Sequence, residues 1–193
     1  MRTITVTNNL SLDGVMQAPA RPDEDVRDGF DRGGWAVGRQ DEVIGRAMAE
    51  EMSRPGVLLL GRRTYEDFAA VWPKRTDNPF TEVLNNTQKY VASRTLREPL
   101  PWQNSTLLSG DAADAVAALK SEPGPDLAIL GSGELIQTLR QGGLIDRYVL
   151  LIHPVVLGVG RRMFPDGAPA AEMRLVASVT APSGVIIATY ESV

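Results

Sequence analysis

The sequence contains no cysteine and only one histidine among its 193 residues. Without cysteine, the chain has no disulfide bonds, no thiolate nucleophile and no cysteine-ligated metal. The single histidine, His153, follows an apolar stretch and precedes a proline, a context that favours a structural residue over the base of a Ser-His-Asp triad. The acidic residues do not have the spacing of a metal-ligand set, so we expect no metal site.

Long hydrophobic runs and an excess of positive charge are also missing. No apolar stretch approaches the roughly 20 residues that a transmembrane helix needs, and the N-terminal sequence MRTITVTNNL lacks the apolar core of a signal peptide. The formal net charge of −4 does not favour binding to nucleic acid. We therefore expect a cytoplasmic protein whose partner is a small molecule, with no membrane and no nucleic acid involved.

Composition and patterning indicate the fold class. With 43% hydrophobic and 23% charged residues, the chain is typical of globular proteins, and its length predicts a single domain over residues 1–193. Apolar and alternating patterns predict strands at 2–8, 57–60, 88–92, 105–108, 127–130 and 148–152. Helical spacing predicts helices at 41–52, 62–72, 111–120 and 133–141, with Asp111 as a cap.

Two further strands are expected at the end of the chain, at 174–180 and 185–191, separated by the turn sequence APSG. Strands and helices alternate before this hairpin. The predicted class is therefore α/β, with a mainly parallel central sheet, an antiparallel C-terminal hairpin and helices on both faces. Residues 17–38, rich in proline, glycine and charge, form a long loop of the kind that often has a functional role.

The stretch VLLLGRRTYEDF at residues 57–68 places a glycine and two arginines directly after a buried strand. Gly61 allows a sharp turn and close approach of a ligand. The N-terminus of the following helix, with Arg62, Arg63 and Thr64, offers amide donors and positive charge to an anion. Solvated arginines at an ordinary strand–turn–helix junction are the alternative.

Two other turns have a related layout. Gly131, Ser132, Gly133 and Glu134 follow the strand at 127–130 and open a helix, and Ser93-Arg94 follows the strand at 88–92. Ligands of parallel sheets bind outside the carboxyl ends of the strands, so we expect all three turns at one edge of the sheet. Together they are suited to a ligand with several phosphates, such as a dinucleotide.

These motifs resemble the dihydrofolate reductase superfamily, and most closely its branch containing the C-terminal reductase domain of the bifunctional riboflavin-biosynthesis deaminase-reductase. The resemblance covers nearly the whole chain and rests on TNNLSLDG at 7–14, LLLGRRTYE at 58–66, VASRT at 91–95 and the long segment at 130–160 that begins LGSGELIQTLRQGGLID. It implies a dihydrofolate-reductase-like fold.

The resemblance also implies NADPH as the cofactor. In this interpretation Gly61, Arg62, Arg63 and Thr64 hold its phosphates, with one of the two arginines on the 2′-phosphate. Ser93 and Arg94 contact the adenosine side. The turn at Gly131, Ser132, Gly133 and Glu134 holds the pyrophosphate and the nicotinamide end. On the substrate side, the resemblance places Ser11, Leu12 and Asp13 between nicotinamide and substrate.

The chain departs from the superfamily pattern at two positions. Ser132 stands where a second glycine is usual. Gly45 stands where folate-reducing members carry a helix acid, and Asp41 lies about one turn earlier. We therefore expect weak dihydrofolate reduction at most, with Asp13 and Asp41 as candidate catalytic acids and Trp35 as a candidate for stacking on a flat substrate or, equally, for filling the edge of the core.

The leading hypothesis is an NADPH-dependent reductase of a small nitrogen heterocycle or imine, such as the ribosylamino-pyrimidine of riboflavin biosynthesis. A weak dihydrofolate reductase and a non-catalytic NADP-binding regulatory protein are the alternatives. The apolar strands at 149–156 and 185–190, together with the resemblance to the riboflavin branch, predict a homodimer formed through the C-terminal strands.

Overall fold

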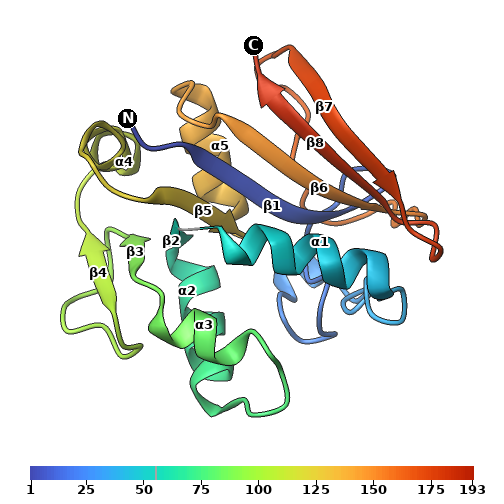
Figure 1. The fold of residues 1–193 in the computed structure, drawn as a ribbon, viewed down its shortest axis with the longest axis horizontal. Coiled ribbons are helices and arrows are strands. Elements are labelled where there is room, and N and C mark those ends of the chain that lie inside the picture. The colour runs from blue at the N-terminus through green and yellow to red at the C-terminus, as the bar shows by residue number, and fades with distance from the viewer. Residues whose placement is uncertain (55) are drawn as a thin grey trace. The chain divides into compact units, whose positions relative to one another are not determined.

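The computed structural model describes residues 1–54 and 56–193, which form an α/β fold (Figure 1). The strands hydrogen-bond in the order β4-β3-β2-β5-β1-β6-β8-β7. Their bounds are β1 (Ile4–Ser11), β2 (Gly56–Gly61), β3 (Lys89–Ala92), β4 (Ser105–Leu108), β5 (Asp126–Leu130), β6 (Arg147–His153), β7 (Met173–Thr180) and β8 (Ile186–Ser192). The predicted fold class is confirmed: the sheet is mostly parallel and ends in an antiparallel hairpin.

The helices are α1 (Glu42–Ser53), α2 (Arg62–Val71), α3 (Thr81–Asn86), α4 (Ala112–Ser121) and α5 (Gly133–Gln141). Four of them match predicted helices. The short helix α3 was not predicted, because its sequence TEVLNN is mostly polar and buries a single residue, Leu84. None of the helices within residues 1–54 and 56–193 has the length and apolar character needed to cross a membrane.

Two compact units make up the chain. The first consists of Met1–Thr5 and Pro55–Asp146, and the second of Val6–Arg54 and Arg147–Val193. Each unit thus combines stretches that are distant in sequence. The expectation of a single domain over residues 1–193 stays a prediction.

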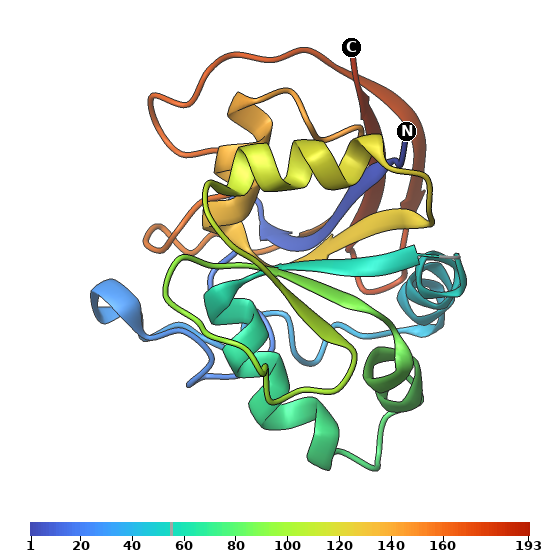
Figure 2. The same ribbon diagram turned by 90° about the vertical axis from the view of Figure 1, so that its left-hand side faces the viewer.

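The first unit is built on parallel strands. Strand β2 pairs with β3, where Gly61 lies opposite Ala92, and with β5, where Leu58 lies opposite Ala128. Figure 2 shows α4 and α5 on one face of these strands and α2 and α3 on the other. Leu59, Leu60 and Ile129 are fully buried, as the continuous apolar runs of a doubly covered sheet require.

The second unit contains the antiparallel strands. Strand β8 pairs with both β6 and β7, which confirms the predicted C-terminal hairpin. Helix α1 packs Ile44 into an apolar cluster with Val149, Leu151, Val185 and Ile187. This cluster fixes α1 against the hairpin.

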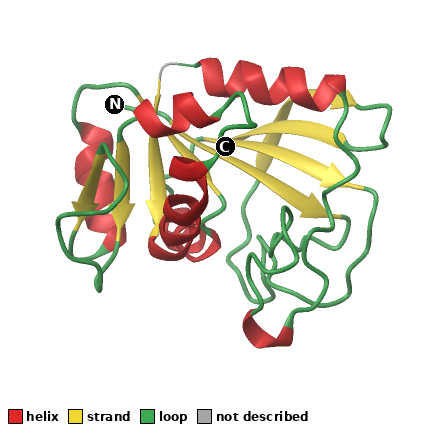
Figure 3. Cartoon of the chain, turned by 90° about the horizontal axis from the view of Figure 1, so that it is seen from below, coloured by secondary structure: helices red, strands yellow, loops and turns green. Residues whose placement is uncertain are grey.

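The segment between β1 and α1 is a long loop, as predicted (Figure 3). Its only helical element is a short 3₁₀ turn at Arg27–Gly29. The loop is nevertheless packed, because Val15, Phe30 and Trp35 are buried in one cluster with Leu157. A loop of this length with its own apolar cluster holds a defined conformation.

Candidate functional site

The turns after β2 and β5 are joined to each other by hydrogen bonds. The backbone N–H of Gly61 donates to Ser132 Oγ at 3.0 Å, and the N–H of Ser132 donates to Thr64 Oγ1 at 2.9 Å. Ser132 Oγ in turn donates to the carbonyl of Leu130 at 3.1 Å. The two strand–turn–helix junctions therefore form one double turn, which we define as residues 61–64 and 131–134.

The backbone of the second junction is left-handed. Gly131 and Ser132 both have φ of 59°, and a Cβ on Gly131 would lie 3.1 Å from the Thr64 side chain. Only glycine fits at position 131 without displacing Thr64. At Ser132 the left-handed conformation costs about 1–2 kcal/mol, which its hydrogen bonds to Gly61 and Thr64 offset. The serine at the expected glycine position thus links the two turns.

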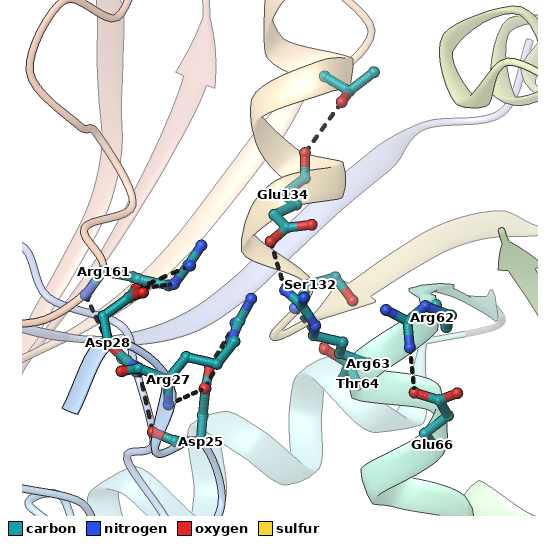
Figure 4. A network of polar contacts seen from close by, with 12 residues as sticks. Asp25, Arg27, Asp28, Arg62, Arg63, Thr64, Glu66, Ser132, Glu134 and Arg161 are labelled. Carbon is teal, nitrogen blue, oxygen red and sulfur yellow. Dashed lines mark hydrogen bonds and ion pairs between the residues drawn. The ribbon is translucent and has the colours of Figure 1, made fainter. Parts of the chain in front are cut away.

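Both arginines of the double turn are paired with carboxylates (Figure 4). Arg63 Nη1 lies 2.7 Å from Glu134 Oε1, so this ion pair bridges α2 and α5. Arg62 Nη1 lies 2.9 Å from Glu66 Oε2, one turn further along α2. All four side chains are well exposed, and exposed pairs of this kind contribute about 0–1 kcal/mol. An anionic ligand can therefore displace the carboxylates at small cost.

The third predicted turn follows β3 at the same edge of the sheet, since Ala92 lies opposite Gly61. Ser93 Oγ accepts hydrogen bonds from the N–H groups of Thr95 and Leu96, both at 3.1 Å. Arg94 is exposed and lies 3.4 Å from Asp111, the N-cap of α4. The first unit thus brings together the carboxyl-end turns of β2, β3 and β5, as the strand alternation predicts.

On the substrate side, Asp13 connects two distant segments of the second unit. Its Oδ1 accepts from the N–H of Leu157 at 3.0 Å and from the Ser11 hydroxyl at 2.7 Å, and its Oδ2 accepts from the N–H of Gly158 at 2.7 Å. Burial raises the pKa of Asp13, but these hydrogen bonds outweigh it and lower the pKa to about 2. Asp13 is therefore ionised at neutral pH and fixes the turn at residues 157–158.

The other candidate acid, Asp41, is the N-cap of α1. Its Oδ1 accepts from the N–H of Ile44 at 3.0 Å and its Oδ2 from the N–H of Ser183 at 3.0 Å. The hydrogen bond from Ile44, followed by contacts with Ser183, lowers the pKa of the Asp41 carboxyl. This geometry attaches the start of α1 to the turn of the β7–β8 hairpin.

Trp35 is buried, with 8% of its surface exposed. Its indole N–H donates to the Gln17 carbonyl at 2.7 Å. Its ring packs edge-on against the His153 imidazole, with 5.4 Å between the ring centroids. This packing corresponds to the core-filling alternative for Trp35. Leu12, by contrast, is 61% exposed and available to a ligand.

His153 has the structural role that its sequence context predicts. Its Nε2 lies 2.8 Å from Asn9 Oδ1. Burial, with a smaller contribution from the charge of Arg39, lowers the pKa of His153 to about 4. The imidazole is therefore neutral at neutral pH. Within the part of the chain that the structure describes, no three His, Asp or Glu side chains are grouped as metal ligands.

Several residues of the site escaped the sequence-based prediction. Glu66 lies four residues after Arg62, a spacing that indicates a helical ion pair. The partners of Asp13 at Leu157 and Gly158 are far away in sequence, and no local pattern identifies them.

A model of the RibD C-terminal domain matches residues 2–187. The chain belongs to the RibD C-terminal domain family.

The chain is also similar to individual relatives in sequence and to solved structures in fold. The uncharacterized protein YyaP of Bacillus subtilis is 32% identical over 169 residues, which span 81% of this chain and 88% of YyaP. A protein assigned to riboflavin biosynthesis from Shewanella sp. PV-4 superimposes with a TM-score of 0.75 at 21% identity, covering 99% of both chains. A pyrimidine reductase-like protein of Corynebacterium diphtheriae gives a TM-score of 0.64 at 11% identity, covering 100% of this chain and 92% of the other. At these identities the two structures establish the fold.

Proposed function

We propose that the protein is an NADPH-dependent reductase that transfers a hydride to a small nitrogen heterocycle or imine. Family membership and the names of the two structural neighbours support a reductase of the riboflavin-pathway type. The observation that carries the proposal is the double turn, in which two helix N-termini and two arginines meet through the hydrogen bonds of Ser132. Helix N-termini with arginines are suited to phosphate groups.

The residues of the first unit fit the phosphates of a dinucleotide. Gly61 and Gly131 keep the turns free of side-chain bulk, and the first turns of α2 and α5 supply amide donors. We assign residues 61–64 to the phosphates, with Arg62 or Arg63 on the 2′-phosphate. Ser93 and Arg94 are assigned to the adenosine side, and residues 131–134 to the pyrophosphate and the nicotinamide end. When bound, NADPH would supply the hydride.

For the residues of the second unit we propose positioning roles. Asp13 and Asp41 both carry lowered pKa values and use their oxygens to accept backbone N–H groups. A carboxylate in this state is a poor proton donor at neutral pH. We propose that the proton required by the reduced nitrogen comes from water, and that the exposed Leu12 contributes to substrate binding.

A phosphorylated substrate such as a ribosylamino-pyrimidine requires a cation outside the double turn. The long loop contributes four arginines, Arg21, Arg27, Arg32 and Arg39. Arg27 is already paired with Asp25 at 2.5 Å (Figure 4). Outside the loop, Arg161 is paired with the loop residue Asp28 at 2.9 Å. Arg39 donates to the Trp35 carbonyl at 2.6 Å and has no carboxylate of residues 1–54 or 56–193 within ion-pairing distance. We therefore propose Arg39 as the residue that holds the substrate phosphate.

The proposed activity is tested by following NADPH oxidation with a panel of pyrimidine, pterin and imine substrates. The reductase proposal expects turnover with at least one small heterocycle and a lower rate with NADH. Tight NADPH binding without turnover on any substrate would instead favour the non-catalytic, NADP-binding alternative.

Dihydrofolate is expected to be a poor substrate. Gly45 occupies the position of the helix acid of folate-reducing relatives, and Asp41 is committed to capping α1 and to the Ser183 N–H. A carboxylate displaced by about 5 Å along a helix does not form a bidentate contact with a pterin. We expect a kcat/KM for dihydrofolate well below the 10⁴–10⁸ M⁻¹s⁻¹ range of enzymes on their own substrates. Steady-state kinetics of the wild type measure this, and efficient dihydrofolate turnover would contradict it. Loss of that turnover in Asp41→Asn would assign it to the Asp41 carboxylate.

We also propose that the protein is a homodimer formed through its C-terminal strands. Strand β7 is the last strand of the order and exposes Leu175 (52%), Val176 (42%) and Val179 (50%). An apolar edge strand of this kind tends to aggregate unless another chain covers it. Light scattering at micromolar concentration should give about twice the chain mass of 20.9 kDa. A Val179→Lys variant, which places a charge on this edge, should shift the mass toward the monomer, whereas a monomeric wild type would refute the proposal.

A further inference from the structure

The two arginines of the double turn differ in where their glutamate partners lie. Arg62 is paired with Glu66 within α2, four residues away. Arg63 is paired with Glu134, which belongs to the first turn of α5 and lies 71 residues away in sequence. Figure 4 shows Arg63 extended toward α5 and Arg62 directed along its own helix. Each arginine is thus neutralised by one carboxylate.

Glu134 occupies the position where an anion would benefit most from α5. The first turn of a helix offers unpaired N–H groups and the positive end of the dipole. A phosphate bound there meets the Glu134 carboxylate as a like charge, and it requires Arg63, which Glu134 holds at 2.7 Å. Glu66 lies one turn inside α2 and has neither of these effects to the same degree.

We propose that Glu134 competes with the phosphate of the ligand for Arg63 and thereby sets the affinity of the double turn for phosphate-bearing ligands. The inference rests on the proposed phosphate-binding role of this turn. The Arg63–Glu134 ion pair lies where the phosphate is proposed to bind. A phosphate displaces the carboxylate because it carries more charge and accepts bidentate hydrogen bonds from a guanidinium.

This competition also bears on cofactor choice. A 2′-phosphate carries a charge of about −1.5 to −2 at pH 7 and can take Arg63 from Glu134. NADH shares the pyrophosphate but has an uncharged 2′-hydroxyl, so it competes with Glu134 for Arg63 with one phosphate group fewer. Removing the charge of Glu134 should therefore strengthen NADPH binding more than NADH binding, because Glu134 moderates affinity through its ion pair with Arg63.

The experiment compares wild type with Glu134→Gln and, as the matched control, Glu66→Gln. Both substitutions remove one negative charge from an exposed pair with an arginine of the same turn. Calorimetric titration at low ionic strength uses three ligands, NADPH, NADH and inorganic pyrophosphate. We expect Glu134→Gln to tighten binding of NADPH and pyrophosphate by about twofold to fivefold, the range that corresponds to loss of an exposed ion pair. Glu66→Gln should change each dissociation constant less, and both variants should keep the wild-type melting temperature.

The outcomes distinguish failure of the proposed competition from failure of the proposed cofactor assignment. If pyrophosphate binds more tightly to Glu134→Gln but no variant binds a nicotinamide dinucleotide, the competition stands and the cofactor assignment fails. If Glu134→Gln binds NADPH and pyrophosphate as wild type does, or more weakly, the competition is overturned even where NADPH binds. Absence of pyrophosphate binding in all three proteins overturns it as well.

Discussion

Replacing Arg62 and Arg63 together with alanine is expected to weaken NADPH binding by roughly tenfold to a hundredfold, with a much smaller effect on NADH. Loss of a charge-assisted hydrogen bond costs about 1.5–3 kcal/mol, and only NADPH carries the 2′-phosphate that these arginines are proposed to contact. In the free protein both side chains take part in exposed ion pairs, so their removal should leave the fold intact. Fluorescence or calorimetric titration of both cofactors measures the difference.

The matched control for this variant is Arg46→Ala combined with Arg75→Ala. Both arginines are exposed and paired with nearby carboxylates, so the control removes the same total charge away from the double turn. It should bind both cofactors as the wild type does. Equal losses for NADPH and NADH in the Arg62 and Arg63 variant would exclude the assignment of these residues to the 2′-phosphate.

A second large effect is expected from Asp13→Asn. The substitution should lower the stability of the fold, and it should lower activity because the turn at residues 157–158 becomes less stable. In Asp13→Asn, an amide NH₂ replaces one of the two oxygens that accept the N–H groups of Leu157 and Gly158. One of these donors is then left without an acceptor, which costs about 1–3 kcal/mol. Urea unfolding of the variant should give a lower midpoint, and KM should rise more than kcat falls because residues 157–158 lose their attachment.

The pH dependence of unfolding provides an independent test of the same carboxylate. The pKa of Asp13 is lowered from 3.8 to about 2 in the folded protein, so the folded state favours the ionised form. The resulting stabilisation is complete above about pH 4, near the ordinary pKa, and is lost as the pH falls toward 2. Asp13→Asn should show a shallower loss of stability across this range than wild type.

Asp31→Asn serves as the control, because the Asp31 side chain is 85% exposed and its ion pair with Arg32 is long, at 4.0 Å. It should retain the stability and the pH profile of wild type. A catalytic acid at position 13 predicts a different pattern: kcat would collapse in Asp13→Asn while the unfolding midpoint stayed unchanged.

Local sequence signals account for most of the fold. The cap at Asp111 was predicted from its position before an alanine-rich helix, and its carboxylate accepts the N–H groups of Ala113 and Asp114. The apolar runs at β2 and β5 and the APSG turn of the hairpin were also recognisable, because burial on both faces and turn chemistry leave clear patterns. Helix α3 left no such pattern, since a short polar helix has no apolar face.

The site was predictable where its chemistry is local. Glycines and arginines after buried strands indicated the turns at 61–64 and 131–134, and parallel strands place such turns at one edge. The hydrogen bond between Gly61 and Ser132 and the ion pair between Arg63 and Glu134 each join residues 71 positions apart. Such contacts depend on strand order and register, which a single sequence does not specify.

For the substrate-side residues, too, the sequence identified the residues but not their distant contacts. Asp13 and Asp41 were singled out as candidate acids from their types and positions, and their partners at Leu157 and Ser183 are supplied by tertiary structure. The hydrogen bond from Leu157 helps to lower the pKa of Asp13 against the effect of burial, and Ser183 adds to the local hydrogen bond from Ile44 in lowering the pKa of Asp41. Trp35 was expected either to stack on substrate or to fill the core edge, and its burial against His153 corresponds to the latter.

The most direct test of the account is a crystal structure of the protein soaked with NADPH. We expect the pyrophosphate at the turn of residues 131–134, the 2′-phosphate on Arg62 or Arg63, and Glu134 moved away from Arg63. Dinucleotide density away from residues 61–64 and 131–134, or an ordered NADPH that leaves both arginines paired with Glu66 and Glu134, would contradict it.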